Sequence, residues 1–495
     1  MQSDQPARTI DVVVIGGGPA GATAAALLAS WAWSVVLVHH DPDHPSLAES
    51  LPWSTRKLLG FLGQLDAVDA AGFHPHFGNI SRWAEKDAVT TTDDPGFHIS
   101  RAAFDRVLRD HACSQGARIV KGQVTRVDPD TSAVSVERAG SEGVARYAPR
   151  FVLDCSGRAG VVARRGLRRA DVGYRTLAIA AEWDCPEWPA GERSHTFVDS
   201  YRDGWAWSVP LSPIQRQCTV MVDADLTTIR KARLPAVYRA ELRKATNIDA
   251  RLARSRQTSE PWACDASLYG CARAADSGVL LVGDAASFIE PLSSAGVKKA
   301  LASAWRAAVA VNTALDRPDM REVAFDFHNR REREVYEDCL RRSAAFFKSA
   351  AAVYDDRFWS VRASVRQESG DLSPMGLSDE NLGRDLAVCR AFEKLRDTPT
   401  LGLKPAHHLA LGRAAVVEDR QIVLRDGVVI PGFEEPVRFA AGVNLPELIR
   451  LAAGSNDVAS LIETYHARVA AIDPRSLLVG LSFLIARDLM VSDAR

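Results

Sequence analysis

Three glycines near the amino terminus have the spacing needed to bind a phosphate group. Gly16, Gly18 and Gly21 follow an apolar run, residues 12–15, and precede a segment rich in alanine and leucine. Gly16 allows a sharp turn, Gly18 lets a pyrophosphate approach the backbone, and Gly21 allows close packing of helix on strand. The amide groups that open the helix, including that of Ala20, attract phosphate. The pattern predicts a dinucleotide site, with a purely structural turn as the alternative.

The second strand of this unit, predicted at residues 34–38, does not end in the expected acid. An acidic residue there would bind the ribose hydroxyls, but His39 and His40 occupy the position, and Asp41 follows. We expect His39 or Asp41 to make the ribose contact. The alternative for the histidines is a solvated loop, and no metal site is expected from their spacing.

The elements that must position these residues follow in order along the chain. The pattern of residues 100–112 predicts an amphipathic helix with Ser100 as its cap. Short strands are predicted as an antiparallel excursion and then as an inserted sheet. They cover residues 118–120, 124–127, 133–137, 145–147, 151–153, 177–183, 195–198, 205–210, 218–223 and 278–282. Helices are predicted at 294–315 and 320–365, a linker at 369–374, and a hairpin at 421–431 that turns at Asp426 and Gly427.

Composition sets wider limits. The chain has 495 residues, 46% of them hydrophobic, and a formal net charge of -1, so no strong field favours nucleic acid or anionic membranes. The apolar window 20–38 is better explained by a helix and a strand than by a membrane span. Because the amino terminus lacks a secretory pattern, we expect a cytoplasmic protein without stable membrane association. The eight cysteines lack CxxC spacing and are expected to be reduced.

Three further segments narrow the dinucleotide. Arg101 opens the helix at 102–112, the segment Asp154-Cys-Ser-Gly157 follows an apolar strand, and Gly283-Asp284 follows another. In order and spacing they resemble the FAD-dependent aromatic hydroxylase superfamily. The resemblance implies FAD, with Arg101 at the pyrophosphate, Asp284 at the ribityl chain and the Val124 backbone beside the adenine. Asp154, Gly157 and Gly283 are then cofactor-binding residues, and the alternative for Asp154 and Asp284 is that they are simple strand-end caps.

The resemblance implies the fold and its domain limits. We expect an α/β protein: a Rossmann-like, glutathione-reductase-type FAD domain, an inserted antiparallel substrate sheet and a mostly helical C-terminal module. The expected FAD domain spans residues 1–165 and 276–316, with the insert at 166–275. A long helical region with its linker follows at 317–380, and the C-terminal module with the hairpin at 381–495.

Two segments resemble the flavin-dependent halogenases more closely. The segment 204–210 (GWAWSVP) is similar to their Trp-x-Trp-x-Ile-Pro motif, and 290–297 (EPLSSAGV) to their Asp-Pro-Leu-Phe-Ser-Ser-Gly-Val segment. The likeness implies that Ser294, Gly296 and Val297 lie under the flavin ring, where helix amides stabilise its reduced form. Glu49, in the segment 49–52 (ESLP), is also expected at the cofactor. Trp205 and Trp207 are expected to shield the flavin, with large core anchors as the alternative.

The lysine that aims hypohalous acid in halogenases is missing. The corresponding segment, residues 72–83, contains no lysine, while Lys57 and Lys86 lie outside it. Without that amine, a flavin C4a-hydroperoxide would transfer its hydroxyl group directly to an aromatic ring. We therefore expect a monooxygenase on a halogenase-like frame. His74 or His76 is a candidate base, with idle loop histidines as the alternative, and Glu290 is a second acid/base candidate.

This combination resembles a narrower group, the flavoproteins that hydroxylate tryptophan during tryptophylquinone biogenesis, such as the one that matures quinohemoprotein amine dehydrogenase. The resemblance implies an indole in a polypeptide as substrate, O₂ as co-substrate, and NAD(P)H or a separate flavin reductase as electron source. The alternatives are a hydroxylase of free aromatics, a halogenase with a displaced lysine, a flavin reductase of isoprenoid double bonds, and a non-catalytic scaffold. Oligomeric state is left open.

Overall fold

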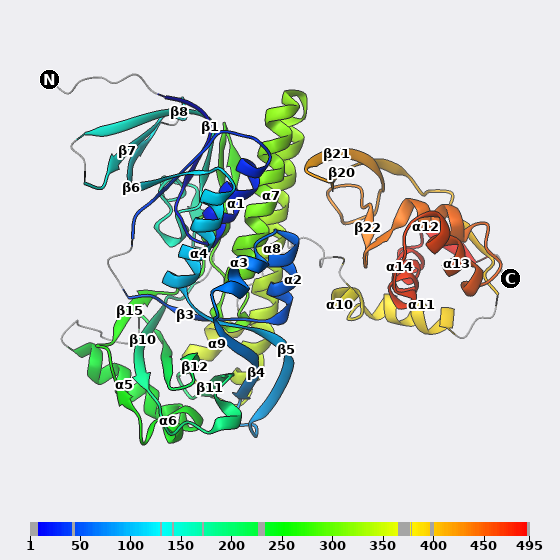
Figure 1. The fold of residues 1–495 in the computed structure, drawn as a ribbon. Helices are drawn as coiled ribbons and strands as arrows, with labels where there is room; N and C mark the ends of the chain where they lie inside the picture. Colours follow the sequence, from blue (N-terminus) through cyan, green and yellow to red (C-terminus); the bar gives the residue numbers. More distant parts are fainter. Residues whose placement is uncertain are drawn as a thin grey trace. The chain divides into compact units, whose positions relative to one another are not determined.

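The computed structural model describes residues 8–41, 45–128, 131–140, 143–170, 173–225, 233–364, 377, 379–396 and 400–492. The chain divides into two compact units, each of which is described by itself (Figure 1). Unit 1 comprises residues 1–316 and 325–368, and unit 2 comprises residues 317–324 and 369–495. The domain limits expected inside unit 1 stay predictions.

The first sheet of unit 1 has seven strands in the described residues, in the order β1-β2-β6-β7-β8-β18-β17, with β1 also paired to β8. Its strands are β1 (Arg8–Ile15), β2 (Val35–His39), β6 (Arg118–Val127), β7 (Val134–Arg138), β8 (Val144–Asp154), β17 (Ala275–Asp276) and β18 (Val279–Leu281). Strands β1, β2, β8 and β18 run parallel, so Ile15, Asp154 and Leu281 align at one edge. This edge is where α/β proteins bind ligands. The expected Rossmann-like α/β fold is confirmed.

The helices beside this sheet begin with α1, which opens directly after the glycine turn. Residues 12–14 of β1 are fully buried and α1 is buried along most of its length, which explains their uniformly apolar composition. The helices of this part are α1 (Pro19–Ser30), α2 (Trp53–Phe61), α3 (Leu65–Ala70) and α4 (Arg101–Ser114). The side chain of Ser100 does not cap α4 as expected. Instead the Ser46 hydroxyl accepts a hydrogen bond from the Ala102 amide at 2.8 Å.

The antiparallel excursion is present, but with fewer and longer strands than expected. Residues 118–120 and 124–127 form one strand, β6, and residues 145–147 and 151–153 form another, β8. The register of β6 with β7 shifts between Val124 and Arg126, so the alternation of apolar residues is interrupted there. The predicted break instead falls at the non-apolar residues 121–123, which β6 includes.

A nine-stranded sheet forms the second layer of unit 1 in the described part of the chain. Its strands are β3 (Ala48–Leu51), β4 (His74–Arg82), β5 (Val89–Ser100), β10 (Thr176–Asp184), β11 (His195–Tyr201), β12 (Gly204–Ser212), β13 (Gln215–Asp223), β14 (Arg256–Gln257) and β15 (Trp262–Asp265). The four long strands expected between 177 and 223 are confirmed. Strands β3 to β5 join them because β4 pairs in parallel with β11, Asn79 opposite Thr196.

The remaining elements of unit 1 are mostly helical. They are the short strands β9 (Arg168–Arg169) and β16 (Gly270–Cys271) and the helices α5 (Leu234–Lys244), α6 (Thr246–Leu252), α7 (Gly296–Asp316), α8 (Arg321–Ala351) and α9 (Arg357–Ala363). Residues 321–324 of α8 are grouped with unit 2. Helix α9 begins where Asp356 accepts a hydrogen bond from the Phe358 amide, which separates it from α8. The expected linker, 369–374, lies outside the described residues.

Unit 2 has its own apolar core, which includes Leu448, Leu461, Leu477 and Leu481. Its helices are α10 (Asp379–Leu382), α11 (Leu386–Arg396), α12 (Leu445–Ala452), α13 (Val458–Arg468) and α14 (Pro474–Ala486). Its strands are β19 (Leu403–Pro405), β20 (Leu411–Glu418), β21 (Gln421–Val428), β22 (Phe439–Ala440), β23 (Val443–Asn444) and β24 (Met490–Ser492). The expected helical character of the C-terminal portion is confirmed.

The hairpin of unit 2 turns at a different place from the one expected. Strand β20 pairs with β21, so the turn falls at Asp419, whose φ is +54°, and Arg420. Asp426 and Gly427 lie inside β21, and the expected turn there was wrong. A side chain at Gly427 would come within 3.1 Å of the Pro436 backbone, so close packing explains this glycine.

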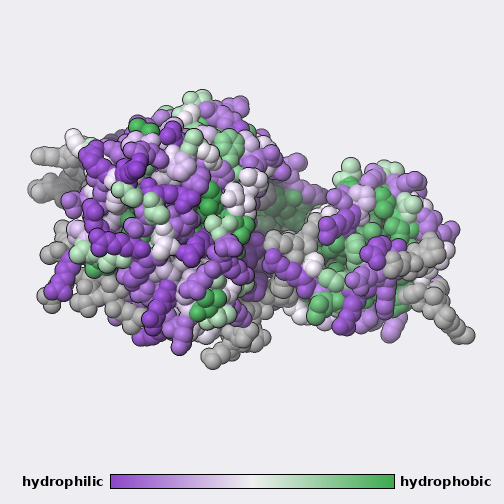
Figure 2. Space-filling model, turned by 90° about the horizontal axis from the view of Figure 1, so that it is seen from below, coloured by the Kyte–Doolittle hydropathy of each residue, from purple (hydrophilic) through white to green (hydrophobic). Residues whose placement is uncertain are grey.

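In the described part of the chain, no helix has both the length and the apolar character needed to cross a membrane. The apolar window at 20–38 resolves into α1 and β2. Hydrophilic residues cover most of the face of unit 1 that Figure 2 shows, with apolar residues in small separate groups.

Candidate FAD and active site

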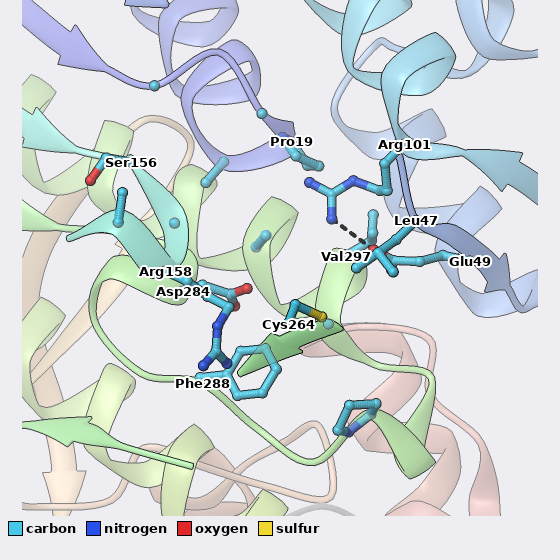
Figure 3. A pocket seen from close by; sticks show the side chains of 18 of the residues that line it. Pro19, Leu47, Glu49, Arg101, Ser156, Arg158, Cys264, Asp284, Phe288 and Val297 are labelled. Carbon is cyan, nitrogen blue, oxygen red and sulfur yellow. Dashed lines mark hydrogen bonds and ion pairs between the residues drawn. The ribbon is translucent and has the colours of Figure 1, made fainter. Parts of the chain in front are cut away.

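A cavity of about 580 Å³ lies in unit 1 and is lined by residues of both sheets. Its lining includes the glycine turn after β1, the Ser156–Arg158 loop after β8, the 3₁₀ turn after β18 and side chains of β11 and β12. In Figure 3, Arg101 from the start of α4, Arg158 from the loop after β8 and Asp284 from the turn after β18 lie around the same space. We call the part formed by Gly16, Gly18, Ala20 and Arg101 the phosphate region.

The phosphate region is shaped by the absence of side chains. A Cβ atom at Gly16, whose φ is +103°, would lie 2.4 Å from the Cys155 carbonyl oxygen, and one at Gly21 would lie 1.9 Å from the Gly16 oxygen. Gly18 is different, because a Cβ atom there would meet only side-chain atoms, at 3.6 Å. Gly16, Gly18 and Ala20 line the cavity and Gly21 packs behind it. The start of α1 therefore offers unshielded amides to an anion.

Arg101 lines the phosphate region from the start of α4. Its guanidinium lies 2.7 Å from Glu49 Oε1 and 3.1 Å from Asp105 Oδ1, and Glu49 lines the cavity as well. Burial lowers the pKa of Arg101, but the charges of Asp105 and Glu49 raise it by more. The net pKa is therefore above the ordinary value, and the group stays cationic. Its backbone amide donates to the Leu47 carbonyl at 2.9 Å, which fixes the start of the helix. The expected Arg101 and Glu49 are thus brought together.

The nucleoside contacts expected after β2 are only partly at the cavity. His39 and Val124 line it. Asp41 is outside the lining, and its carboxylate lies 2.6 Å from Lys121 Nζ in an exposed pair. His39 is therefore better placed than Asp41 for a ribose contact.

Asp154 organises a loop rather than lining the cavity. Its fully buried carboxylate accepts hydrogen bonds from the amides of Ser156, Val162 and Ala163 at 2.7–3.1 Å. The loop thereby presents Gly157 to the cavity. Arg158 follows Gly157, and its guanidinium lies 4.0 Å from the centre of the Phe288 ring (Figure 3). Both residues line the cavity, and neither was predicted from the sequence.

Asp284 faces the cavity from the turn after β18, as expected. Lys299 Nζ, buried on α7, lies 3.3 Å from Asp284 Oδ1 and donates to the Gly283 carbonyl at 3.2 Å and to the Ser287 carbonyl. Gly283, with φ of +64°, packs behind the turn, and a Cβ there would lie 3.0 Å from that of Ala20. Lys299 was missed, although it lies one turn into a helix that was predicted.

The segment after this turn contributes a buried acid. Glu290 is 2% exposed, lines the cavity, and its Oε1 atom has no hydrogen-bond partner. Burial raises the pKa of the Glu290 carboxyl to about 7, against the charge of Arg362, which lowers it. Ser294, Gly296 and Val297 also line the cavity, at the start of α7.

Trp205 and Trp207 share one face of β12 and line the cavity. Their rings stack with centroids 4.9 Å apart and an interplanar angle of 29°. Trp205 is also a core residue, 6.4 Å from the Trp83 ring, so the wall and the core anchor are the same side chain. We call Trp205, Trp207, Glu290 and their cavity neighbour Thr196 on β11 the reaction region.

His74 and His76 are not among the lining residues. They lie on β4 beside His98 of β5, with ring centroids 5.9 and 4.8 Å from that ring. Burial lowers the pKa of both histidines. Among the described residues that line the cavity there is no lysine, and Lys57 lies outside it, near the Trp53 ring.

The cavity fits FAD in its contacts. An unshielded helix start and the half-buried guanidinium of Arg101 suit a pyrophosphate, a carboxylate faces the cavity beyond them, and much of the remaining wall is aromatic and apolar. Gly16 and Gly21 admit no side chain even without a cofactor, whereas a Cβ atom at Gly18 would meet only the Arg101 and Asp105 side chains, so the backbone there is open to the cavity.

The family model described as tryptophan halogenase matches residues 38–372. The chain belongs to this family. Its relatives include the tryptophan 2-halogenase of Chondromyces crocatus, 29% identical over 72% of this chain and 72% of that protein. The sulochrin halogenase of Aspergillus terreus is 27% identical over 70% of this chain and 72% of its own length. Flavin-dependent halogenases bind FAD, as a solved complex of PltM shows, so the family agrees with the cavity.

Solved structures of the tryptophan halogenase family share the fold. The flavin-dependent halogenase CmlS has a TM-score of 0.79 at 23% identity, covering 99% of this chain and 96% of its own. The peptidyl tryptophan dihydroxylase QhpG has a TM-score of 0.68 at 21% identity, covering 97% of this chain and 100% of its own. The expected resemblance to the halogenase-like superfamily is confirmed. The expected special closeness to the tryptophan-hydroxylating group is not, since halogenases predominate among the similar proteins.

Proposed function

We propose that this protein uses FAD, O₂ and a halide ion to halogenate an electron-rich aromatic ring, with the halogen replacing a ring hydrogen that leaves as a proton. The observation that carries the proposal is the continuous cavity, in which a phosphate region and an aromatic wall share one space with a buried, unpaired carboxyl group. Membership of the tryptophan halogenase family supports halogen as the transferred group. Reduced FAD, when bound, activates dioxygen; the electrons come from NAD(P)H or a separate flavin reductase.

The residues of the chain supply binding, shielding and proton transfer. The amides that open α1 and the Arg101 guanidinium hold the pyrophosphate, and Asp284 holds the ribityl hydroxyls. Trp205 and Trp207 keep water from the reacting atoms and offer a flat surface to an aromatic substrate. Glu290, with a pKa near neutrality, can hold or release a proton at its Oε1 atom.

Hydroxylation is a second candidate, favoured by one observation. No lysine is among the described residues that line the cavity, so no amine stands ready to aim a halogenating species. Lys299 is the buried lysine next to the cavity, and its Nζ atom is already held by Asp284 and two carbonyl groups. The fold shared with QhpG supports the indole of a tryptophan in a polypeptide as the substrate in this case.

One experiment separates the candidates. The protein, loaded with FAD, is supplied with a flavin reductase, NADH, O₂ and bromide or chloride, with free tryptophan or a tryptophan-containing peptide as substrate. Replacement of ring hydrogen by halogen, recognised by its isotope pattern, supports the first proposal. A gain of oxygen in the presence of halide supports the second. A protein that binds FAD but modifies no aromatic substrate under these conditions contradicts both.

A further inference from the structure

The wall of the reaction region contains two hydroxyl groups that lead away from the cavity. Thr196 on β11 and Ser50 on β3 both line it, and their oxygens are 2.5 Å apart. Ser50 Oγ lies 3.0 Å from the Nδ1 atom of His98 on β5. His98 is 1% exposed and is not a lining residue, and these two hydroxyls connect its ring to the cavity by hydrogen bonds.

The hydrogen bonds of His98 fix which group donates and which accepts in the series Thr196, Ser50 and His98. Its Nε2 atom lies 3.1 Å from the Ser194 carbonyl oxygen, which can only accept, so Nε2 carries the hydrogen. Nδ1 is then a free acceptor for the Ser50 hydroxyl, and the Ser50 oxygen accepts from Thr196. The Thr196 oxygen is left to accept a proton from the cavity. Each group in the chain is therefore oriented to take a proton from the reaction region.

His98 is held neutral. Burial lowers its pKa well below the ordinary value, and the charges of His76 and His74 on β4 and of Arg216 on β13 lower it further, while the Ser194 carbonyl raises it. A weak base of this kind is sufficient here, because a ring that has gained an electrophilic group is a strong acid at the substituted carbon. The His98 imidazole also remains unprotonated at neutral pH and can therefore accept a proton.

We propose that Thr196, Ser50 and His98 form a proton-accepting relay that removes the ring proton of the aromatic substrate. The proposal deepens the proposed function and serves either candidate, since halogenation and hydroxylation both break a ring C–H bond. The C–H electron pair returns to the ring as its proton passes to Thr196 Oγ1. The Thr196 proton moves to Ser50 Oγ, and the Ser50 proton to His98 Nδ1, which leaves an imidazolium held by Ser194. His98 acts through the hydroxyls and is a positioning and proton-storing residue.

The test uses the FAD-loaded enzyme with reductase, bromide and tryptophan carrying either hydrogen or deuterium on the indole ring. In the wild type we expect proton loss to be fast, with equal rates for both substrates. Thr196→Val and Ser50→Ala each interrupt the relay, so turnover should fall by about 10²-fold and a primary deuterium isotope effect should emerge. Thr196→Ser keeps a hydroxyl group and should restore the wild-type behaviour.

A matched control separates the relay from packing. Ser208 is a fully buried hydroxyl on neighbouring β12 that bonds Arg216 and is outside the cavity lining. Ser208→Ala should lower thermal stability without creating an isotope effect. His98→Gln should show the same isotope effect as Ser50→Ala and lose the acid limb of the wild-type pH profile. Wild-type turnover with unchanged rates and no isotope effect in Ser50→Ala and Thr196→Val rejects the relay. Lack of any ring product in the wild type rejects the proposed function instead.

Discussion

The phosphate region and the reaction region share one cavity but are built in opposite ways. Apart from Arg101, the phosphate region is one contiguous turn, in which backbone amides face the cavity and Gly16 leaves no space for a side chain. The reaction region is assembled from side chains of the consecutive strands β11 and β12 and of the segment before α7, which comes much later in the sequence. Backbone recognition leaves a motif that can be read from one stretch of sequence, whereas side-chain recognition depends on which strands become neighbours.

The largest effect is expected at Gly18. A Cβ atom at Gly18 meets only the Arg101 and Asp105 side chains, at 3.6 Å, so Gly18→Val requires adjustment of side chains rather than of backbone, while the new side chain enters the place expected for the pyrophosphate. We expect FAD affinity to fall by roughly 100-fold, equivalent to about 2.7 kcal/mol, measured by flavin absorbance after gel filtration. Gly60→Ala, on the far helix α2, is the control. A yellow Gly18→Val protein with unchanged affinity would remove this turn from the FAD site.

The second effect is expected at Glu290. It tests the other half of the comparison, because the reaction region depends on side chains rather than on backbone amides. Glu290→Gln removes the titrating group while FAD remains bound, so kcat should fall by about 10²-fold, and a pH-rate limb near 7 should vanish. Unchanged turnover would take Glu290 off the reaction pathway.

The same substitution has an opposite effect on stability. Because burial raises the pKa of Glu290, the folded state binds the extra proton, and stability is lost as pH rises from about 4.5 to about 7. Glu290→Gln should therefore raise Tm at pH 8 relative to wild type, and less so at pH 4.5. Glu332 is the matched control: although burial raises its pKa, Arg306, His328 and Lys299 lower it below the ordinary value, so Glu332→Gln should lower Tm at pH 8. Equal shifts in both variants contradict the expectation.

A smaller effect is expected at the aromatic wall. Trp207→Leu removes the ring stacked on Trp205 but leaves the Trp205 core contacts in place. Loss of this part of the wall lets water reach the reacting atoms, so the share of O₂ released as hydrogen peroxide should increase by roughly threefold. A peroxide assay during turnover measures it. Peroxide release equal to that of the wild type would make Trp207 a packing residue.

The smallest effect is expected at Asp41. Its exposed pair with Lys121 is outside the cavity lining, so Asp41→Ala should change FAD affinity by less than about twofold. His39→Ala should weaken FAD binding more, because His39 lines the cavity. Isothermal titration with FAD compares the two variants. The reverse order would restore the acid to its expected role at the ribose.

The local sequence pattern predicted the helices and strands well, but it predicted less well which of them lie next to one another in the fold. The glycine turn, the helix at Arg101 and the strands between 177 and 223 were predicted because each depends on residues next to one another. His98 was missed as a relay residue because its meaning comes from its direct pairing with His74 on β4 and Ser50 on β3. The turn of the unit 2 hairpin was predicted at the wrong place for the same reason: Gly427 is explained by close packing against Pro436, which is not its neighbour in the sequence.

Lys299 was hidden for a related reason. From the sequence alone, a lysine in an apolar helix is expected to be exposed. Lys299 is instead buried because it binds the turn before the helix. Its three acceptors belong to residues 283–287, which come before the helix but fold back over it. Such a contact is created by the tertiary turn and leaves no periodic signal.

The cavity draws its walls from both sheets of unit 1, so a bound FAD would touch segments from Ile15 to Ala300 at once. The cofactor would then act as a non-covalent crosslink, and mass action would raise the unfolding free energy by about 2.7 kcal/mol at 100 times its dissociation constant. Removal of FAD should lower the unfolding free energy by the same amount, which denaturant unfolding of the FAD-free and FAD-loaded protein would measure.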